Sequence, residues 1–283
     1  MTPLFPNLSA HEPSAGVTAA PAHILISGVS KRFAIPGGEV IALKDIDLSI
    51  GAGQFVCLLG PSGCGKSTLL NAIAGFAPPT AGTITVDDKP VTGPGPERGM
   101  VFQEYALFPW MTVAQNVAFG LEIKGLARAQ ITARVAELLA MLKLTDFRDR
   151  FPKDLSGGMR QRVAIARVLA LDPPVLLMDE PFGALDSLTR RSLQDELLRI
   201  WAAMGKTIIF VTHSIEESIY LADRIVVMTY RPGTIKADIR VTMPHPRDGA
   251  APEFNTLKKQ LSSLVMEEQN RHEAAERVAA TMD

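Results

Sequence analysis

The 283-residue sequence has no long hydrophobic run, only two cysteines and almost no net charge. Its apolar stretches, such as 175–178 and 208–211, are far shorter than the about 20 residues that a membrane-spanning helix needs. The first 22 residues lack the basic start and the apolar core of a signal peptide, and their Pro, Ala and Ser content predicts a disordered arm over 1–22. We therefore expect any membrane role to depend on a partner chain.

The net charge and the cysteine and histidine content argue against further classes of protein. The formal net charge is −1, so no overall basic field favours nucleic acid as a partner. Cys57 and Cys64 do not form the pattern of a disulfide-stabilised protein, and the five histidines show no metal-ligand spacing. These features favour a reducing cytoplasm.

What the sequence does contain is a glycine-rich segment, 60–68, between the apolar runs 55–59 and 69–74. In a strand–turn–helix context this Walker A pattern predicts a nucleoside triphosphate site, because N–H groups at a helix start and the helix dipole favour an anion. Lys66 is expected at the β and γ phosphates and the Ser67 hydroxyl on Mg²⁺. The residues predicted to bind the nucleotide are Gly60, Pro61, Ser62, Gly63, Cys64, Gly65, Lys66, Ser67 and Thr68.

Hydrophobic periodicity predicts an α/β fold. Strands and helices alternate in the second half of the chain, which indicates a parallel sheet covered by helices. Between Gly233 and 253 the patterning is weak, and 253–266 carries an apolar stripe that predicts a docked helix with a fraying polar continuation. The expected strands are 23–33, 39–50, 82–86, 175–179, 206–212 and 224–229, and the expected helices are 127–144, 187–204, 215–222 and one that follows Ser156-Gly157-Gly158 and ends near 171.

Two acidic residues end the buried strand predicted at 175–179. Asp179 and Glu180 follow four apolar residues, so the carboxyl edge of the sheet would present both carboxylates. With a phosphate loop upstream, Asp179 is expected to hold Mg²⁺, and Glu180 is expected to orient or deprotonate the attacking water.

A second glycine-containing helix start lies at 155–162. This segment resembles the signature motif of the ATP-binding-cassette (ABC) family, in which a Gln is usual where Met159 stands here. The resemblance implies a head-to-tail homodimer in which each ATP lies between one subunit's phosphate loop and the other's signature helix. The signature residues that would bind ATP in trans are Ser156, Gly157, Gly158 and Met159.

Further residues match motifs of this family in the expected order. Gln103 resembles the Q-loop glutamine that reaches Mg²⁺ or the water, Asp186 belongs to a D-loop at the dimer interface, and His213 resembles the switch histidine at the γ-phosphate. Phe33 resembles the aromatic residue that stacks on adenine, although burial in the core is an equal alternative.

The resemblance covers roughly 23–235 and implies an ATPase that uses ATP and Mg²⁺. The implied fold is a P-loop ABC nucleotide-binding domain: a mostly parallel RecA-like core sheet, an N-terminal antiparallel β subdomain and an inserted helical subdomain at about 104–172. The remaining chain, 236–283, is a C-terminal extension with an amphipathic helix.

Three kinds of cassette protein compete: an importer ATPase, an exporter ATPase and a soluble factor acting on ribosomes or DNA. A single cassette without membrane helices, coiled-coil insertions or room for a β-rich regulatory domain favours the importer. The segments 91–103, 107–117, 181–186 and 231–233 resemble the nitrate/sulfonate/taurine branch. This branch implies a small anion as solute, with a vitamin precursor or an aromatic acid as the alternative.

The importer interpretation also implies partners and a location. The homodimer would bind transmembrane permease subunits at the cytoplasmic face of the inner membrane and act only indirectly with an extracytoplasmic solute-binding protein. No nucleic acid is expected.

Two hypotheses concern single side chains. Tyr105, Phe108 and Trp110 either pack in the helical subdomain or line a groove for the permease, and we assign Phe108 or Trp110 to the groove. Cys64, near a helix start and a lysine, is expected to have a lowered pKa and to be alkylated readily.

Overall fold

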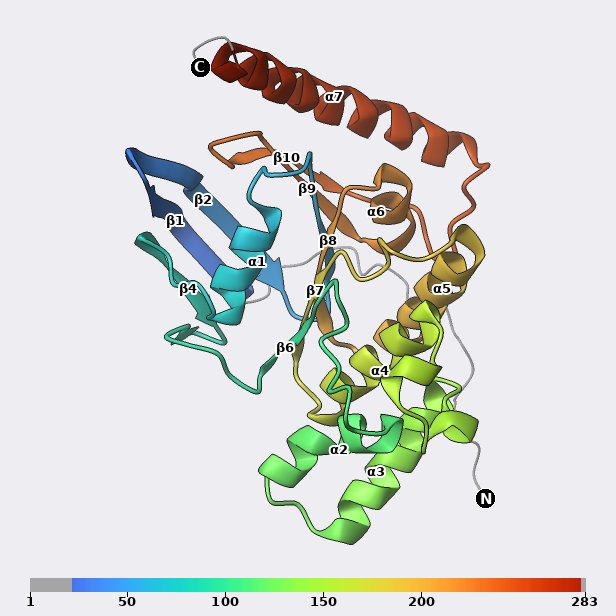
Figure 1. The fold of residues 1–283 in the computed structure, drawn as a ribbon. Helices are drawn as coiled ribbons and strands as arrows, with labels where there is room; N and C mark the ends of the chain where they lie inside the picture. Colours follow the sequence, from blue (N-terminus) through green and yellow to red (C-terminus); the bar gives the residue numbers. More distant parts are fainter. Residues whose placement is uncertain (1–21, 281–283) are drawn as a thin grey trace.

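The computed structural model describes residues 22–280, which form two β-sheets with helices between and around them (Figure 1). The N-terminal arm expected at 1–22 lies, apart from Ala22, outside the described residues. The strands are β1 (Ala22–Ile35), β2 (Gly38–Gly51), β3 (Phe55–Leu59), β4 (Ala81–Val86), β5 (Lys89–Pro90), β6 (Arg98–Val101), β7 (Val175–Asp179), β8 (Thr207–Thr212), β9 (Arg224–Met228) and β10 (Ile235–Arg240). The α-helices are α1 (Lys66–Ala74), α2 (Val113–Ile123), α3 (Arg128–Met141), α4 (Gly157–Ala170), α5 (Ser187–Met204), α6 (Ile215–Leu221) and α7 (Pro252–Ala280).

The central sheet has six strands in the order β10-β9-β3-β8-β7-β6. Its strands are parallel except β10, which pairs antiparallel with β9. Because parallel strands end at one edge, the residues that follow β3, β7 and β8 meet there. The second sheet, β2-β1-β4-β5, is antiparallel.

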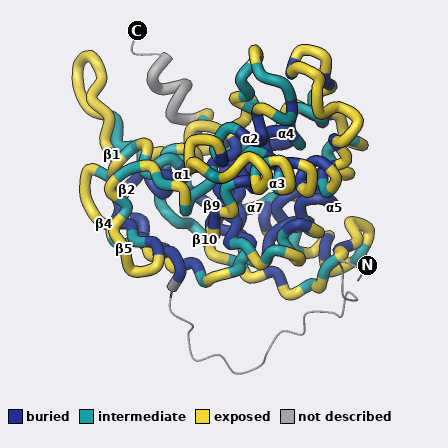
Figure 2. Tube along the Cα trace, turned by 90° about the horizontal axis from the view of Figure 1, so that it is seen from below, coloured by how far each residue is buried: buried dark blue, intermediate teal, exposed yellow. Residues whose placement is uncertain are grey.

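Strand β3 shows how the core is built. All five of its residues are buried, as expected for a parallel strand covered on both faces. Val56 and Leu58 belong to the core that α1 and the antiparallel sheet share, whereas Phe55, Cys57 and Leu59 face the core formed with the helices. Helix α1 therefore lies between the two sheets, and buried segments run through the middle of the molecule (Figure 2).

Helices α2, α3 and α4 pack together beside the sheet, within the range 104–172 (Figure 1). The loop before α2 is fixed by the fully buried amide of Asn116. Its Oδ1 accepts from the N–H of Phe108 at 2.9 Å, and its Nδ2 donates to the carbonyls of Phe108 at 3.2 Å and Met111 at 3.0 Å. This loop follows Gln103, so Asn116 anchors the connection between the sheet edge and the helices.

Two expectations for the C-terminal region were incomplete. Strand β10 was not expected, although its six residues, Ile235–Arg240, alternate between apolar and polar side chains. Helix α7 extends to Ala280, well beyond the apolar stripe at 253–266, and its acidic residue Glu268 is buried. Within residues 22–280, no helix combines the length and the apolar character that a membrane span requires.

Candidate functional site

The glycine-rich loop connects β3 to α1 at the carboxyl edge of the central sheet. Gly65 caps α1 at φ 99°, and a Cβ on this residue would lie 2.7 Å from Leu43 Cδ2 and 2.9 Å from the Ala42 carbonyl. Glycine alone fits this position, both for its dihedral angle and for its space. The chain thus enters α1 through a tight turn whose following N–H groups have no intrahelical partner.

Lys66 is buried directly beneath this turn. Its Nζ donates to the carbonyls of Gly60 at 2.8 Å and Pro61 at 2.9 Å and lies 3.8 Å from Cys64 Sγ. These carbonyls are neutral acceptors, so the ammonium charge is not cancelled by a carboxylate in direct contact. The lysine therefore places positive charge inside the loop, as an anion site needs.

Ser67 and Asp179 join α1 to the end of β7. The Ser67 hydroxyl donates to Asp179 Oδ1 at 2.8 Å. Burial and the neighbouring Glu180 raise the pKa of Asp179, and the Ser67 hydrogen bond and Lys66 oppose this only in part. A hydroxyl and a carboxylate side by side are oxygen ligands that Mg²⁺ prefers, and a cation there would favour the charged carboxylate. The residues present therefore fit a divalent cation.

Glu180 and His213 face one another across the neighbouring ends of β7 and β8. Glu180 Oε2 lies 2.9 Å from His213 Nδ1, and the Glu180 N–H donates to the Val211 carbonyl at 3.1 Å. Glu180 has φ 43°, a left-handed conformation that side chains disfavour and that is found at functional sites. The backbone therefore points this carboxylate at the sheet edge at a cost in strain.

Gln103 approaches the same carboxylate from β6. A Cβ added to Gly183 would lie 3.9 Å from Glu180 Oε2 and 4.0 Å from Gln103 Nε2, so the two side chains flank this glycine. The structure thus brings together Gln103, Asp179, Glu180 and His213 beside the phosphate loop.

Phe33 does not belong to the core. It lies on β1, its side chain is 42% exposed, and Lys31 Nζ lies 5.3 Å from its ring centroid. The core alternative for Phe33 was therefore wrong, and its ring is accessible for stacking.

The signature segment lies in a different part of the molecule from the phosphate loop. Ser156 caps α4, is exposed, and accepts from the Met159 N–H at 3.4 Å. Helix α4 packs against α2, α3, α5 and β6, whereas α1 packs against β2, β6, β7 and β8. Asp186 caps α5 by accepting from the Thr189 N–H at 3.0 Å, and this hydrogen bonding lowers its pKa.

Gly157 and Gly158 bring the signature segment close to α5. A Cβ on Gly158 would lie 2.5 Å from Thr189 Cγ2, and one on Gly157 would lie 3.2 Å from Leu185 Cδ2. The signature and the D-loop therefore form one continuous surface.

The expectation for Cys64 was wrong. Its side chain is fully buried, and burial raises the pKa of the thiol although Lys66 acts in the opposite direction. The helix start and the lysine were correctly placed, but the loss of solvent around the sulfur outweighs them.

The sequence interpretation missed a buried network behind His213. Glu217 accepts from the Thr212 hydroxyl at 2.5 Å and from Gln194 Nε2 at 2.9 Å, and its N–H donates to the Ser214 hydroxyl at 3.3 Å. The spacing Ser214-x-x-Glu217 is a helix-start pattern and could have revealed it. This network fixes the turn that carries His213.

Comparisons with known proteins agree with this geometry. The ABC transporter family model matches residues 43–183. The nitrate import ATP-binding protein NrtD of Synechocystis is 46% identical over 252 residues, which are 86% of this chain and 95% of that protein. The taurine import ATP-binding protein TauB of Jannaschia is 49% identical over 237 residues, which are 83% and 88% of the two chains. The chain belongs to the ABC transporter family of ATP-binding proteins.

A solved ABC cassette supports the same assignment at the level of structure. MJ0796, a dimer in a post-hydrolysis state bound to ADP and Pi, superposes with a TM-score of 0.70 and 33% identity, covering 78% of this chain and 99% of that one. The predicted family and P-loop ABC fold are therefore confirmed. As an ABC ATPase, this chain binds nucleotide and hydrolyses ATP.

Proposed function

We propose that this ABC ATPase drives the import of a small anion such as taurine, an alkanesulfonate or nitrate. The observation that carries the ATPase chemistry is the convergence of Lys66, Ser67, Asp179 and Glu180 at one edge of the sheet. The names of the nitrate and taurine import relatives support the class of solute.

The phosphate loop binds the phosphates of ATP. Backbone N–H groups of 60–68 and the Lys66 ammonium neutralise phosphate oxygens, and Phe33 stacks on the base. Ser67, Asp179 and Gln103 would hold Mg²⁺, which supplies charge neutralisation between the β and γ phosphates when bound.

Glu180 orients the attacking water and accepts its proton. Its carboxylate oxygen is already directed by His213, whose ring lies at 2.9 Å, so the base has a fixed orientation before substrate arrives. His213 in turn donates toward the γ-phosphate, where negative charge develops.

The active unit is a head-to-tail homodimer. Ser156 is exposed and lies in a different part of the chain from the phosphate loop, and the MJ0796 cassette was solved as a dimer. Ser156, Gly157, Gly158 and Met159 of each subunit complete the nucleotide site of the other, with Asp186 at the interface. Permease subunits bind this dimer at the cytoplasmic face of the inner membrane.

We keep the domain boundaries expected from the sequence as part of this proposal. We assign ATP binding to 23–235, with a helical subdomain at about 104–172, and a separate supporting role to 236–283. The buried core that α1 shares with the antiparallel sheet lies within 23–235, which supports the extent of the ATP-binding part.

An uptake assay tests the proposal. A strain lacking this ABC ATPase is expected to lose uptake of one of taurine, alkanesulfonates or nitrate, and the wild-type gene should restore it, whereas a Glu180→Gln variant should not. A vitamin precursor and an aromatic acid serve as comparison solutes. Unchanged uptake of all three anions in the deletion strain would reject the assigned solute class.

A further inference from the structure

The loop between β9 and β10, residues 229–234, lies against the phosphate loop. From this β9–β10 loop, Arg231 Nε donates to the carbonyl of Gly63 at 3.3 Å. A Cβ added to Gly63 would lie 3.5 Å from Arg231 Nη2, so the guanidinium covers the outer side of this glycine. The phosphate loop thus has a cationic neighbour that none of the Walker, signature or switch motifs includes.

Gly233 attaches the same loop a second time. Its N–H donates to the Ala42 carbonyl at 2.9 Å, and its carbonyl accepts from the Lys44 N–H at 3.0 Å. A Cβ at Gly233 would lie 2.2 Å from the Cys64 carbonyl, a distance that no side chain tolerates. The backbone of the β9–β10 loop therefore touches the phosphate loop directly beside the residue that Arg231 contacts.

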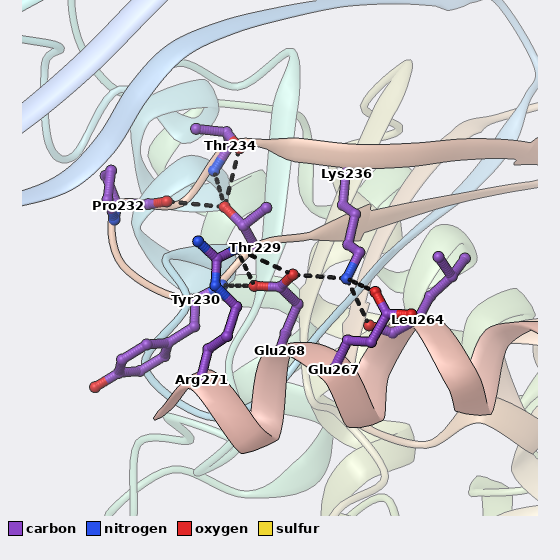
Figure 3. A network of polar contacts seen from close by, with 9 residues as sticks. All are labelled: Thr229, Tyr230, Pro232, Thr234, Lys236, Leu264, Glu267, Glu268 and Arg271. Atoms are coloured by element: carbon purple, nitrogen blue, oxygen red, sulfur yellow. Dashed lines mark hydrogen bonds and ion pairs between the residues drawn. The ribbon is translucent and has the colours of Figure 1, made fainter. Parts of the chain in front are cut away.

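The other end of the β9–β10 loop is fastened to α7 by Glu268 (Figure 3). This side chain is 1% exposed, and its oxygens accept from the Tyr230 N–H at 3.0 Å and from Lys236 Nζ at 2.7 Å. Burial alone would raise the pKa of Glu268, but these hydrogen bonds keep its pKa below the usual value. The ring of His272 also stacks on Tyr230, with centroids 4.2 Å apart.

The β9–β10 loop is closed internally, so its two ends are mechanically connected. Thr229 Oγ1 donates to the Pro232 carbonyl at 2.8 Å and accepts from the Thr234 N–H at 2.9 Å (Figure 3). Tyr230 and Arg231 lie between these bonds. A displacement of the Tyr230 backbone would therefore also move Arg231.

We propose that Arg231 positions the phosphate loop for nucleotide binding and that Glu268 of α7 keeps Arg231 in place. The Gly63 carbonyl and the Cys64 N–H belong to one planar peptide, so anchoring the carbonyl also fixes the direction of the N–H. The guanidinium adds positive potential beside an anion site. This inference rests on the proposed ATP-binding role of the phosphate loop, and it gives α7 control over ATP affinity.

The test compares ATP affinity and turnover of full-length variants. Arg231→Ala is expected to weaken ATP binding about threefold to tenfold with little change in kcat, the size expected for a lost hydrogen bond. Arg231→Lys, which keeps a charge and a donor, should recover part of the affinity. Glu268→Ala should weaken binding about twofold to fivefold, and the double variant should bind ATP no more weakly than Arg231→Ala, because the two residues act in series.

Two matched controls separate positioning from general stability. Glu267→Ala removes another carboxylate bonded to Lys236, at 2.7 Å, while Glu268 still holds the Tyr230 N–H. Arg240→Ala removes an exposed arginine from the same hairpin. Both should bind ATP like the wild type, with thermal unfolding recorded for each protein. Glu268→Gln retains the side-chain volume and replaces Glu268→Ala if that variant does not fold, with the same non-additivity expected.

Specific outcomes overturn the inference. Wild-type affinity in Arg231→Ala rejects the positioning role, and additive losses in the double variant reject the connection through the β9–β10 loop. An equal loss in Glu267→Ala also rejects it. A wild-type protein that fails to bind ATP would instead reject the proposed function itself.

Discussion

The hydroxyl of Ser67 lies 2.8 Å from a carboxylate oxygen of Asp179, although 112 residues separate them in the chain. The sheet order explains this contact, because β3 and β7 both flank β8, and α1 follows β3 directly. The first turn of α1 therefore reaches the end of β7. A phosphate-binding helix start and an acidic strand end form one site only because of this strand order.

Replacing the proposed general base should separate hydrolysis from binding. In Glu180→Gln the side chain can no longer accept a proton, so the ATPase rate should fall about 10²- to 10⁴-fold while ATP affinity stays close to wild type. Steady-state hydrolysis and equilibrium binding measure the two quantities, and size-exclusion chromatography with ATP should show a persistent dimer. Hydrolysis at the wild-type rate would remove Glu180 from this role.

Replacing the buried Lys66 should weaken ATP binding itself. Lys66→Ala removes the ammonium inside the phosphate loop, so ATP affinity should fall at least about tenfold, as expected for a lost charged hydrogen bond. Titration calorimetry with a non-hydrolysable ATP analogue measures this change. Lys89→Ala, at an exposed position on β5, is the matched control and should bind normally.

The cysteines should be unreactive in the folded protein. Burial raises the pKa of both Cys57 and Cys64, so at pH 7 the thiols stay protonated, and alkylation should be at least about tenfold slower than for a free thiol. A thiol reagent should modify both residues only after unfolding. Rapid modification of the native protein that disappears in Cys64→Ser would contradict this expectation.

Neutralising Asp179 should stabilise the protein and inactivate it. Because folding raises the pKa of Asp179, the native protein binds the carboxyl proton more tightly than the unfolded chain does. The contribution of Asp179 to the free energy of unfolding therefore falls as pH rises from the ordinary carboxyl pKa through the raised pKa of the folded state. Asp179→Asn should therefore raise Tm at pH 7 by about 2 °C. The difference should vanish in acid below the ordinary carboxyl pKa, and a lower Tm at pH 7 would argue against this prediction.

The two aromatic residues considered for a permease groove should behave differently. Trp110 is 70% exposed. The Phe108 ring instead packs against Phe119, with ring centroids 4.6 Å apart, and lies under the guanidinium of Arg167. Trp110→Ala should lower transport while the purified ATPase keeps its activity. Phe108→Ala should lower the free energy of unfolding by about 2 kcal/mol. Parallel loss of transport and purified ATPase activity in Trp110→Ala would reject the groove role.

Much of the site could be predicted because its chemistry is carried by short contiguous segments. Residues 60–68 and 175–180 combine a local fold signal with reactive side chains, so the spacing alone placed Lys66, Ser67, Asp179 and Glu180. The helix at 187–204 was also predicted with its observed ends, and the structure shows that Asp186 caps its start and Gly205 its end.

The missed features depend on contacts between distant segments. Strand β10 is held by β9 and by Lys236 bonds to α7, and the apolar–polar alternation of Ile235–Arg240 is a short local signal that the prediction overlooked. Glu268 is buried against this strand, where it bonds Lys236, so its burial could not be predicted without first predicting the strand. For Cys64, the charges nearby were visible in the sequence, but the closing of the core around the sulfur was not.

The left-handed backbone at Glu180 has an evolutionary consequence. Glycine or asparagine would relieve the strain in the main chain at this position, whereas glutamate adopts this conformation at a cost of about 1–3 kcal/mol. A laboratory lineage of this gene selected for heat resistance alone should therefore replace Glu180 early, and one selected for solute-dependent growth should retain it.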